Sequence, residues 1–214
     1  MPDQCPTSAR PVPKCGPTPR TSEPDLHSKR LAMWEYDGRR RPVFAVEPGA
    51  GQESVWDYPR PPRIEAERRL VTVDFGGRRL ARSERAWRVL ETASPPTVYL
   101  PRRDVDLSLL EPAPGRSRCE WKGTASYWRL HAGFDLPAAG GAEAAADSGP
   151  VAWSYEDPTP AFRELAGTLS FYPSRVTCRL GGEVVRPQAG GFYGGWVTDE
   201  IVGPFKGDPG TGGW

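Results

Sequence analysis

The stretch Arg69-Leu70-Val71-Thr72-Val73-Asp74-Phe75-Gly76-Gly77, continued by Arg78–Arg82, decides the fold class of this chain. Val71, Val73 and Phe75 alternate with other residues, which predicts a strand with one apolar face. A pair of glycines can adopt the positive φ angles of a two-residue hairpin loop. Residues 78–82 are therefore expected to return as the antiparallel partner strand.

Similar patterns recur along the chain. Gly181-Gly182 predicts a second hairpin between residues 175–180 and 183–186. Two short helices are also expected, one over 84–91, capped by Ser83 and stopped by Pro95-Pro96. The other begins at Thr159-Pro160 and ends at Gly167. Further short strands are expected at 97–100, 125–131, 151–155 and 168–172. Many short strands and few helices indicate a mainly β domain of antiparallel sheets.

Composition narrows the class of protein. The chain has 214 residues, which suits one domain with tails, and its 25 Pro and 24 Gly disfavour long helices. The net charge of +1 and the scattered arginines argue against nucleic acid as a partner. No stretch is apolar over the length that a membrane helix needs, so no membrane partner is expected.

The cysteines and the N-terminus bear on localisation. Met1-Pro2-Asp3 does not begin a basic region followed by an apolar core, so no secretory signal is expected. The four cysteines contain no C-x-x-C pair, which argues against a disulfide framework and a zinc site. We therefore expect a cytoplasmic protein with no metal and no cofactor.

The chain divides into four parts. Residues 1–30 are rich in Pro, Ser, Thr and charge, which predicts a disordered tail. Residues 31–52 form a poorly defined lead-in, in which 34–36 and 43–46 could pair as a hairpin. The β domain covers 53–186 and includes a flexible loop at 137–148. Residues 187–214 are rich in glycine and aromatic residues and are expected to dock on the domain.

Several motifs stand out together: Glu53–Pro62, Glu91-Thr92 with Pro95-Pro96, Cys119–Gly123, Ala152–Tyr155, Phe171–Pro173 and Gly190–Gly207. They resemble motifs of the bacterial DUF427 proteins, and the last resembles a single-domain subgroup of that family. The resemblance implies an Mss4-like β-tent, with two small antiparallel sheets meeting at an angle around a cleft. The family is catalogued in places as nucleotidyltransferase-like. Zinc does not carry over, because the paired knuckles of the fold relatives are missing.

The chain departs from the family pattern at three positions. Ser94 stands where a His is expected, Pro150 where an Asn is expected, and Ser108 where an acidic residue is expected. An activity that needed that His or Asn in relatives would not carry over to this chain.

The block Cys119-Glu120-Trp121-Lys122 supplies the candidate catalytic residues. Cys119 is a candidate nucleophile, its pKa lowered by Lys122, or alternatively a buried small residue. His131 is twelve residues on and is the one His outside the tail. Glu120 and Lys122 would share a face of an extended segment, as general base and anion binder, or as an ordinary ion pair.

The aromatic residues supply candidate ligand contacts. They could stack against a planar ligand beside Lys122, or could fill an aromatic core. Alternation sends Tyr127 and Trp128 to opposite faces of their strand. The candidate ring contacts are Trp121, Tyr127, Trp153, Tyr155 and Tyr172.

Asp104-Val105-Asp106 is the one D-x-D pattern considered for metal. Nucleotidyl transfer would need a glycine-rich phosphate loop leading into a helix and a third carboxylate. Gly76-Gly77 precedes a strand instead, so no metal ligands are assigned.

Three functions remain open on the sequence. The first is a β domain that binds a planar or anionic small molecule in a cleft around Glu120 and Lys122. The second is a hydrolase or transferase, including a nucleotidyltransferase, that uses Cys119 or Glu120. The third is a protein-interaction module that docks through residues 187–214.

Overall fold

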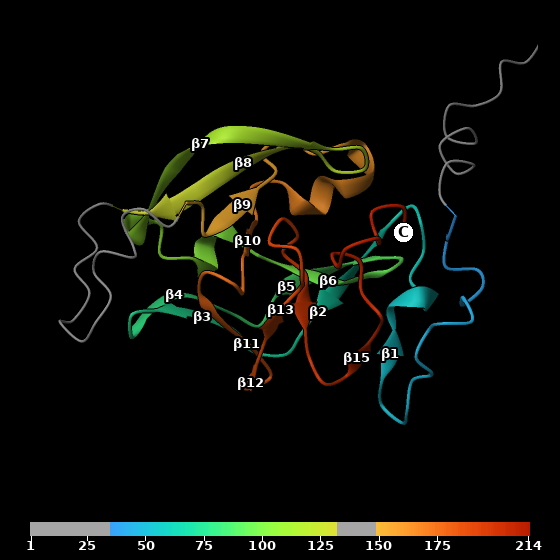
Figure 1. Ribbon diagram of the computed structural model, residues 1–214. Helices are drawn as coiled ribbons and strands as arrows, with labels where there is room; N and C mark the ends of the chain where they lie inside the picture. The colour runs from blue at the N-terminus through green and yellow to red at the C-terminus, as the bar shows by residue number, and fades with distance from the viewer. Residues whose placement is uncertain (1–34, 132–148) are drawn as a thin grey trace, which may run out of the picture.

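A computed structural model describes residues 35–131 and 149–214. The larger sheet is antiparallel and has seven strands (Figure 1). In spatial order these are β2 (Arg63–Glu67), β5 (Ala86–Glu91), β6 (Ser94–Leu100), β10 (Leu169–Phe171), β9 (Ala152–Ser154), β8 (Gly123–Leu130) and β7 (Leu110–Cys119).

A second sheet has four strands and packs against the first. In spatial order it contains β12 (Glu183–Val184), β11 (Thr177–Leu180), β3 (Val71–Phe75) and β4 (Arg78–Ser83). Two small pairs complete the β structure: β1 (Glu53–Ser54) with β15 (Ile201–Val202), and β13 (Arg186–Pro187) with β14 (Trp196–Val197). The helical segments are the short 3-10 turns η1 (Val55–Asp57), η2 (Arg102–Asp104), η3 (Leu107–Leu109) and η4 (Pro160–Leu165).

Both glycine hairpins are confirmed. Gly76 and Gly77 have φ angles of 56° and 79° and connect β3 to β4. Gly181 and Gly182 have φ angles of 59° and 93° and connect β11 to β12. The expected mainly β class is likewise what the chain adopts.

The helix expected over 84–91 is wrong, because residues 86–91 form β5. Strand β5 lies between β2 and β6, so both its edges are paired. Neither of its two sets of alternate residues is exposed, so its sequence lacks the simple alternation of a half-buried strand. Pro95 and Pro96 belong to β6 instead of stopping a helix. They lie opposite the register shift between Val89 and Glu91, where the ladder needs no N–H donor.

The second expected helix is a short 3-10 segment, η4. Pro160 occupies its first turn, and Gly167 follows with a φ angle of 65°. Thr159 makes no side-chain cap on it. Its hydroxyl is used elsewhere, on the neighbouring hairpin.

The lead-in contains no strand over its described residues 35–52, so the hairpin expected there is wrong. Its aromatic residues pack on the domain instead. Tyr36 and Phe44 both make edge contacts with the buried Trp56, and Val43 is fully exposed. Trp34, the expected tail 1–30 and the expected loop 137–148 lie outside the described residues.

The main core lies between the two large sheets. It combines side chains of β3 and β4, such as Val73 and Leu80, with side chains of the larger sheet, such as Val98 and Leu100. Tyr99, between those two β6 residues, belongs to a second apolar cluster. Because alternate residues of a strand point to opposite faces, this second cluster lies on the other face of the larger sheet.

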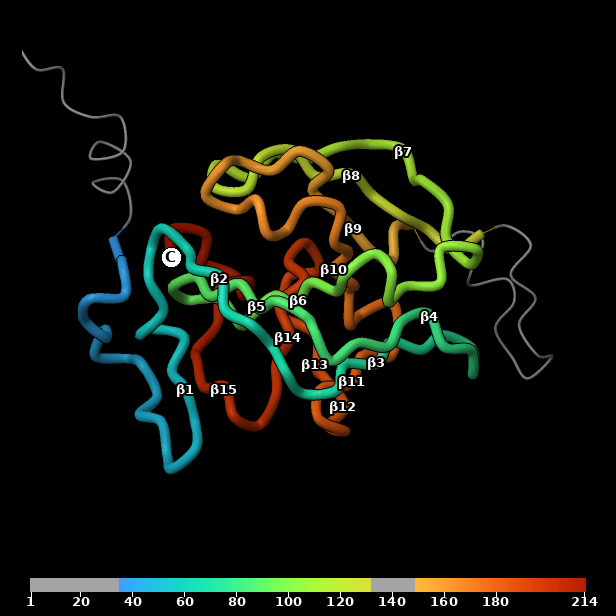
Figure 2. The backbone as a smooth tube through the Cα atoms, turned by 180° about the vertical axis from the view of Figure 1, so that it is seen from behind, coloured from blue at the N-terminus to red at the C-terminus, as the bar shows by residue number. Residues whose placement is uncertain are grey.

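Residues 187–214 run along the domain and end beside the lead-in, as Figures 1 and 2 show from opposite sides. Trp196 is 1% exposed and its Nε1 donates to the backbone oxygen of Phe171 at 3.1 Å. Trp214 stacks on Phe44 and contacts Trp56 edge-on. Phe192 is the exception, since it is 68% exposed. Across the described residues, no helix has the length and apolar character to cross a membrane.

Candidate functional site

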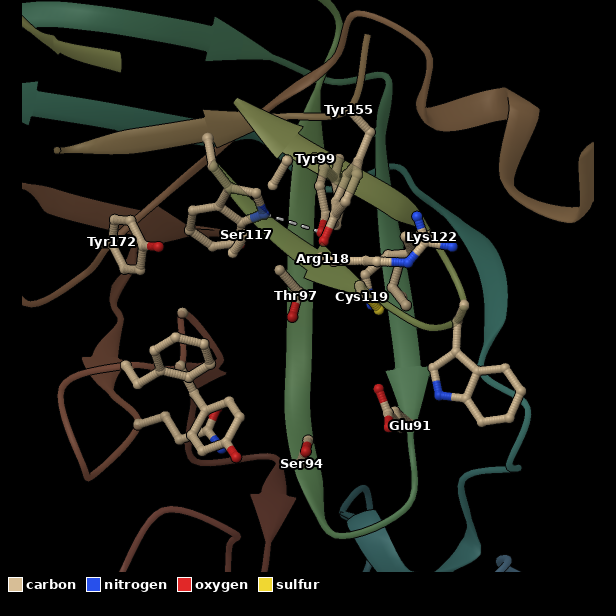
Figure 3. A pocket seen from close by; sticks show the side chains of 18 of the residues that line it. Glu91, Ser94, Thr97, Tyr99, Ser117, Arg118, Cys119, Lys122, Tyr155 and Tyr172 are labelled. Carbon is tan, nitrogen blue, oxygen red and sulfur yellow. Dashed lines mark hydrogen bonds between the residues drawn. The ribbon is translucent and has the colours of Figure 1, made fainter. Parts of the chain in front are cut away.

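A cavity of about 300 Å³ lies on the second-cluster face of the larger sheet (Figure 3). Strands β5, β6, β7, β8 and β9 contribute to its wall, and residues 188–206 approach it from the C-terminal segment. All eight candidate residues from the sequence line it: Cys119, Glu120, Trp121, Lys122, Tyr127, Trp153, Tyr155 and Tyr172.

Strand register builds the aromatic side of the cavity. Tyr99 of β6 is opposite Ser170 of β10, Ser170 is opposite Trp153 of β9, and Trp153 is opposite Tyr127 of β8. Residues in register across adjacent strands share a face, so these rings gather on one surface. Trp153 Nε1 donates to the Tyr99 hydroxyl at 3.2 Å, and the Trp153 and Tyr172 rings have centroids 4.4 Å apart.

Alternation also separates the neighbouring rings as expected. Tyr127 packs in the second cluster, whereas Trp128 packs against the main core. Trp128 Nε1 donates to Ser154 Oγ at 2.8 Å, and the Arg102 guanidinium lies 4.9 Å from the Trp128 ring centroid. Trp128 therefore takes no part in the cavity.

Glu120, Trp121 and Lys122 form the tight turn between β7 and β8. The extended geometry expected for Glu120 and Lys122 is therefore wrong, although both line the cavity from this turn. Gly123 follows with a φ angle of 101°, which only glycine adopts readily. Thr159 fixes the turn, because its backbone N–H donates to the Lys122 oxygen at 3.2 Å and its hydroxyl to the Trp121 oxygen at 2.5 Å.

Lys122 is a half-buried cation in this wall. Burial alone would lower the pKa of its ammonium group, but neighbouring Tyr99, Cys119 and Glu91 outweigh burial and raise that pKa above its usual value. Burial also raises the pKa of the Tyr99 and Tyr155 phenols.

A second cluster of charged side chains lies nearer the C-terminal segment. Glu91 forms an ion pair with the buried Arg60 at 3.6 Å. Lys206 donates from Nζ to the Trp214 oxygen at 2.7 Å, and its Nζ lies 5.8 Å from the Tyr193 ring centroid. Burial lowers the pKa of Lys206, and the charge of Arg60 lowers it further.

Sequence reasoning missed part of this site: Glu91, Tyr99, Arg118, Tyr193 and Lys206 also line the cavity. Tyr99 could have been found from its position in an expected strand. The sequence pattern places Glu91 at the end of an expected helix and therefore does not predict that its side chain lines the cavity. Ser94, where the family resemblance leads us to expect His, lines the cavity as well, whereas Ser108 and Pro150 do not.

No imidazole lines the cavity among the described residues. His131 follows the far end of β8, and its Nε2 lies 3.9 Å from a Glu111 carboxylate oxygen. Cys119, half-buried at the end of β7, therefore has Lys122 and not a histidine as its polar neighbour.

The two carboxylates of the D-x-D pattern have structural roles. Asp104 accepts hydrogen bonds from Ser83 and Arg85, at 2.7 and 3.0 Å. Asp106 caps η3 by accepting from the Ser108 backbone N–H. Within 35–131 and 149–214, no three His, Cys, Asp or Glu side chains are grouped as a metal site.

The fold and the cavity define the class of protein: a mainly β domain with a cavity of about 300 Å³ on one face of its larger sheet. The family model described as a domain of unknown function, DUF427 (NTP_transf_9), matches residues 63–181. That match covers more than half of the 214 residues, so the chain belongs to the DUF427 family. No curated protein matches the chain.

Proposed function

We propose that this protein binds a small molecule with a planar ring and an anionic group in the cavity beside Lys122. The observation that carries the proposal is convergence: residues from separate strands, a hairpin turn and the C-terminal segment line one cavity of about 300 Å³. That volume is at the lower end of the range for small-molecule sites, so the ligand is small.

The rings support a planar ligand. Trp153, Tyr155 and Tyr172 line the cavity. Trp153 packs against the Tyr172 ring and is hydrogen-bonded to Tyr99, and the Tyr155 ring packs against Tyr99. A flat ligand ring can pack against such side chains in stacked or edge-on geometry. Because these side chains are already packed together, little side-chain order has to be created on binding.

The charges support an anionic group. Arg118, Lys122 and Lys206 line the cavity with Glu91 and Glu120, and Glu91 is already paired with Arg60. Lys122 keeps its ammonium group in a partly dehydrated wall, where an opposite charge is attracted more strongly than in water.

The test is a thermal-shift screen of planar acids, amines and neutral rings. A ligand that binds the folded state alone raises Tm as its concentration increases. Planar acids should raise Tm of the natural protein, and Lys122→Met should reduce that shift. Arg129→Met is the matched control, since Arg129 is exposed on the same hairpin and pairs with Glu111. Amines that stabilise the protein as well as acids would contradict the proposal.

A second candidate function is chemistry on the Cys119 thiol. Cys119 lines the cavity close to Lys122, and a cationic neighbour is a feature of reactive cysteines. Iodoacetamide labelling over a range of pH tests it. If Cys119 reacts at lower pH than an ordinary thiol, and if this reactivity disappears in Lys122→Met, a hydrolase or transferase function would be favoured. If labelling of Cys119 depends on pH as it does for an ordinary thiol, a function that uses the Cys119 thiol would be rejected.

We also propose that the two large sheets form the Mss4-like β-tent that the family resemblance implies. Support comes from the two antiparallel sheets that pack on a shared core. Superposition on an Mss4-like structure tests this, and a mismatch in strand order would overturn it. A cytoplasmic location remains a prediction.

A further inference from the structure

We infer that the ligand carries a carboxylate on its planar ring, and that one carboxylate oxygen accepts a hydrogen bond from the indole N–H of Trp121. This inference rests on the proposed function and narrows it to planar carboxylic acids.

Trp121 lines the cavity, and its indole nitrogen is a buried donor. Trp121 is 8% exposed and lines the cavity, and its Nε1 has no hydrogen-bond partner among the described residues. Folded proteins leave few buried polar groups unpaired, because each one keeps its full desolvation cost. An unpaired donor on a residue that lines an open volume would be satisfied if the bound ligand supplies the acceptor.

Trp56 Nε1 and Ser170 Oγ are also buried without a partner among the described residues. Neither residue lines the cavity. Trp121 is therefore distinguished by being both unpaired and next to space that a ligand can occupy.

The donor is held in place before any ligand binds. Trp121 packs in the second apolar cluster, and the Thr159 hydroxyl donates to its backbone oxygen. A donor that is fixed in advance costs little to align on binding. A site of this kind discriminates strongly, because a ligand without the acceptor leaves the donor unpaired.

The neighbouring residue points to a carboxylate and not a neutral acceptor. Lys122 follows Trp121 in the same turn and lines the same cavity with an ammonium group. A carboxylate has two oxygens, so one can accept from the indole N–H while the other accepts from the ammonium group. Charge-assisted hydrogen bonds of this kind are stronger than neutral ones.

Three planar probes of one size test the inference: naphthoate, naphthamide and naphthylmethylamine. Affinities are measured by calorimetry on the natural protein, Trp121→Phe and Trp87→Phe. The last is a matched control, because Trp87 packs against the same apolar cluster but does not line the cavity. We expect naphthoate to bind best and naphthylmethylamine worst. Trp121→Phe should weaken naphthoate and naphthamide about tenfold, the loss of one hydrogen bond.

A second readout is independent of the variant's stability. In the natural protein, the indole N–H resonance of Trp121 should shift on titration with naphthoate and not with naphthylmethylamine. Equal affinity for acid and amine, or unchanged naphthoate affinity in Trp121→Phe, would overturn the inference while the cavity still binds planar molecules. If none of the three probes binds the natural protein, the proposed function fails and the inference fails with it.

Discussion

Gly194 lies so close to Trp153 that a Cβ atom at position 194 would be 2.1 Å from Cη2 of the indole ring. The contact joins the C-terminal segment to the aromatic wall of the cavity. Residue 194 lies outside the family match, which ends at residue 181. Part of the cavity is therefore built by a segment beyond the matched family domain.

Gly194→Ala should damage the cavity by displacing either the C-terminal segment or the Trp153 ring. We expect a loss of about 1–3 kcal/mol in the free energy of unfolding, as for an overpacked core. Affinity for a planar acid should fall as well. Denaturant unfolding and calorimetry measure the two effects. Gly212→Ala is the control, since a Cβ there meets nothing within 4 Å; equal behaviour of the two variants would refute the contact.

Thr159→Val should loosen the turn that carries Trp121 and Lys122. The change removes the hydroxyl donor to the Trp121 oxygen but keeps the backbone bond to Lys122. Stability should fall by about 1 kcal/mol, the usual net value of one hydrogen bond. Ligand affinity should fall too, because the two donors lose their fixed position. Thr124→Val, at an exposed site on the same hairpin, should change neither quantity.

Binding of a planar acid should not depend on pH between about pH 6 and about pH 9, where a carboxylate is ionised and an ordinary lysine is charged. The pKa of Lys122 is raised, so its ammonium group persists through this range. Its contribution to folding stability is likewise present below the unfolded lysine pKa and is lost as pH rises through the higher folded value. Calorimetry at several pH values checks this, with Lys206→Met as a control because the pKa of Lys206 is lowered. Affinity that falls well before pH 9 in that variant as well would show that Lys122 loses its proton too early.

A carboxylate away from the cavity should contribute to the loss of folding stability at low pH. Glu67 is buried and accepts two hydrogen bonds from the Arg69 side chain, at 3.0 and 2.7 Å. Burial would raise the pKa of Glu67, but the bonds from Arg69 lower it overall. Its stabilising effect is therefore present above the unfolded glutamate pKa and is lost as pH falls through the lower folded value.

Glu67→Gln should destabilise the protein by about 2 kcal/mol at neutral pH, less than for a fully buried pair because Arg69 is partly exposed. The difference from the natural protein should shrink at about pH 3, where carboxyl groups take up protons. Thermal unfolding at both pH values checks this. A difference that stays constant with pH would mean that the charge of Glu67 is not what stabilises the fold.

The sequence was most informative where local chemistry dictates the structure. Gly76-Gly77 and Gly181-Gly182 specify hairpins because few residues other than glycine adopt their φ angles. Alternation correctly separated Tyr127 from Trp128. The strand at 86–91 was missed because neither of its faces is exposed, so its sequence lacks the apolar–polar alternation of a half-buried strand.

The side chains of the site come together through pairing of strands that are far apart in the sequence. Tyr99 and Trp153 are 54 residues apart and meet only because β10 lies between their strands. Lys206 and Gly194 reach the cavity from a segment with little regular structure, whose path no local pattern predicts. Cys119–Lys122 was found because thiol, charge and ring occur together, although its turn geometry was not expected.

The most direct test of the central claim is a crystal structure of the protein soaked with a bromonaphthoate, with bromine located by its anomalous scattering. The account predicts one strong bromine peak inside the cavity and the carboxylate at the Trp121–Lys122 turn. Bromine peaks found only outside the cavity, or an empty cavity at saturating ligand, would contradict it.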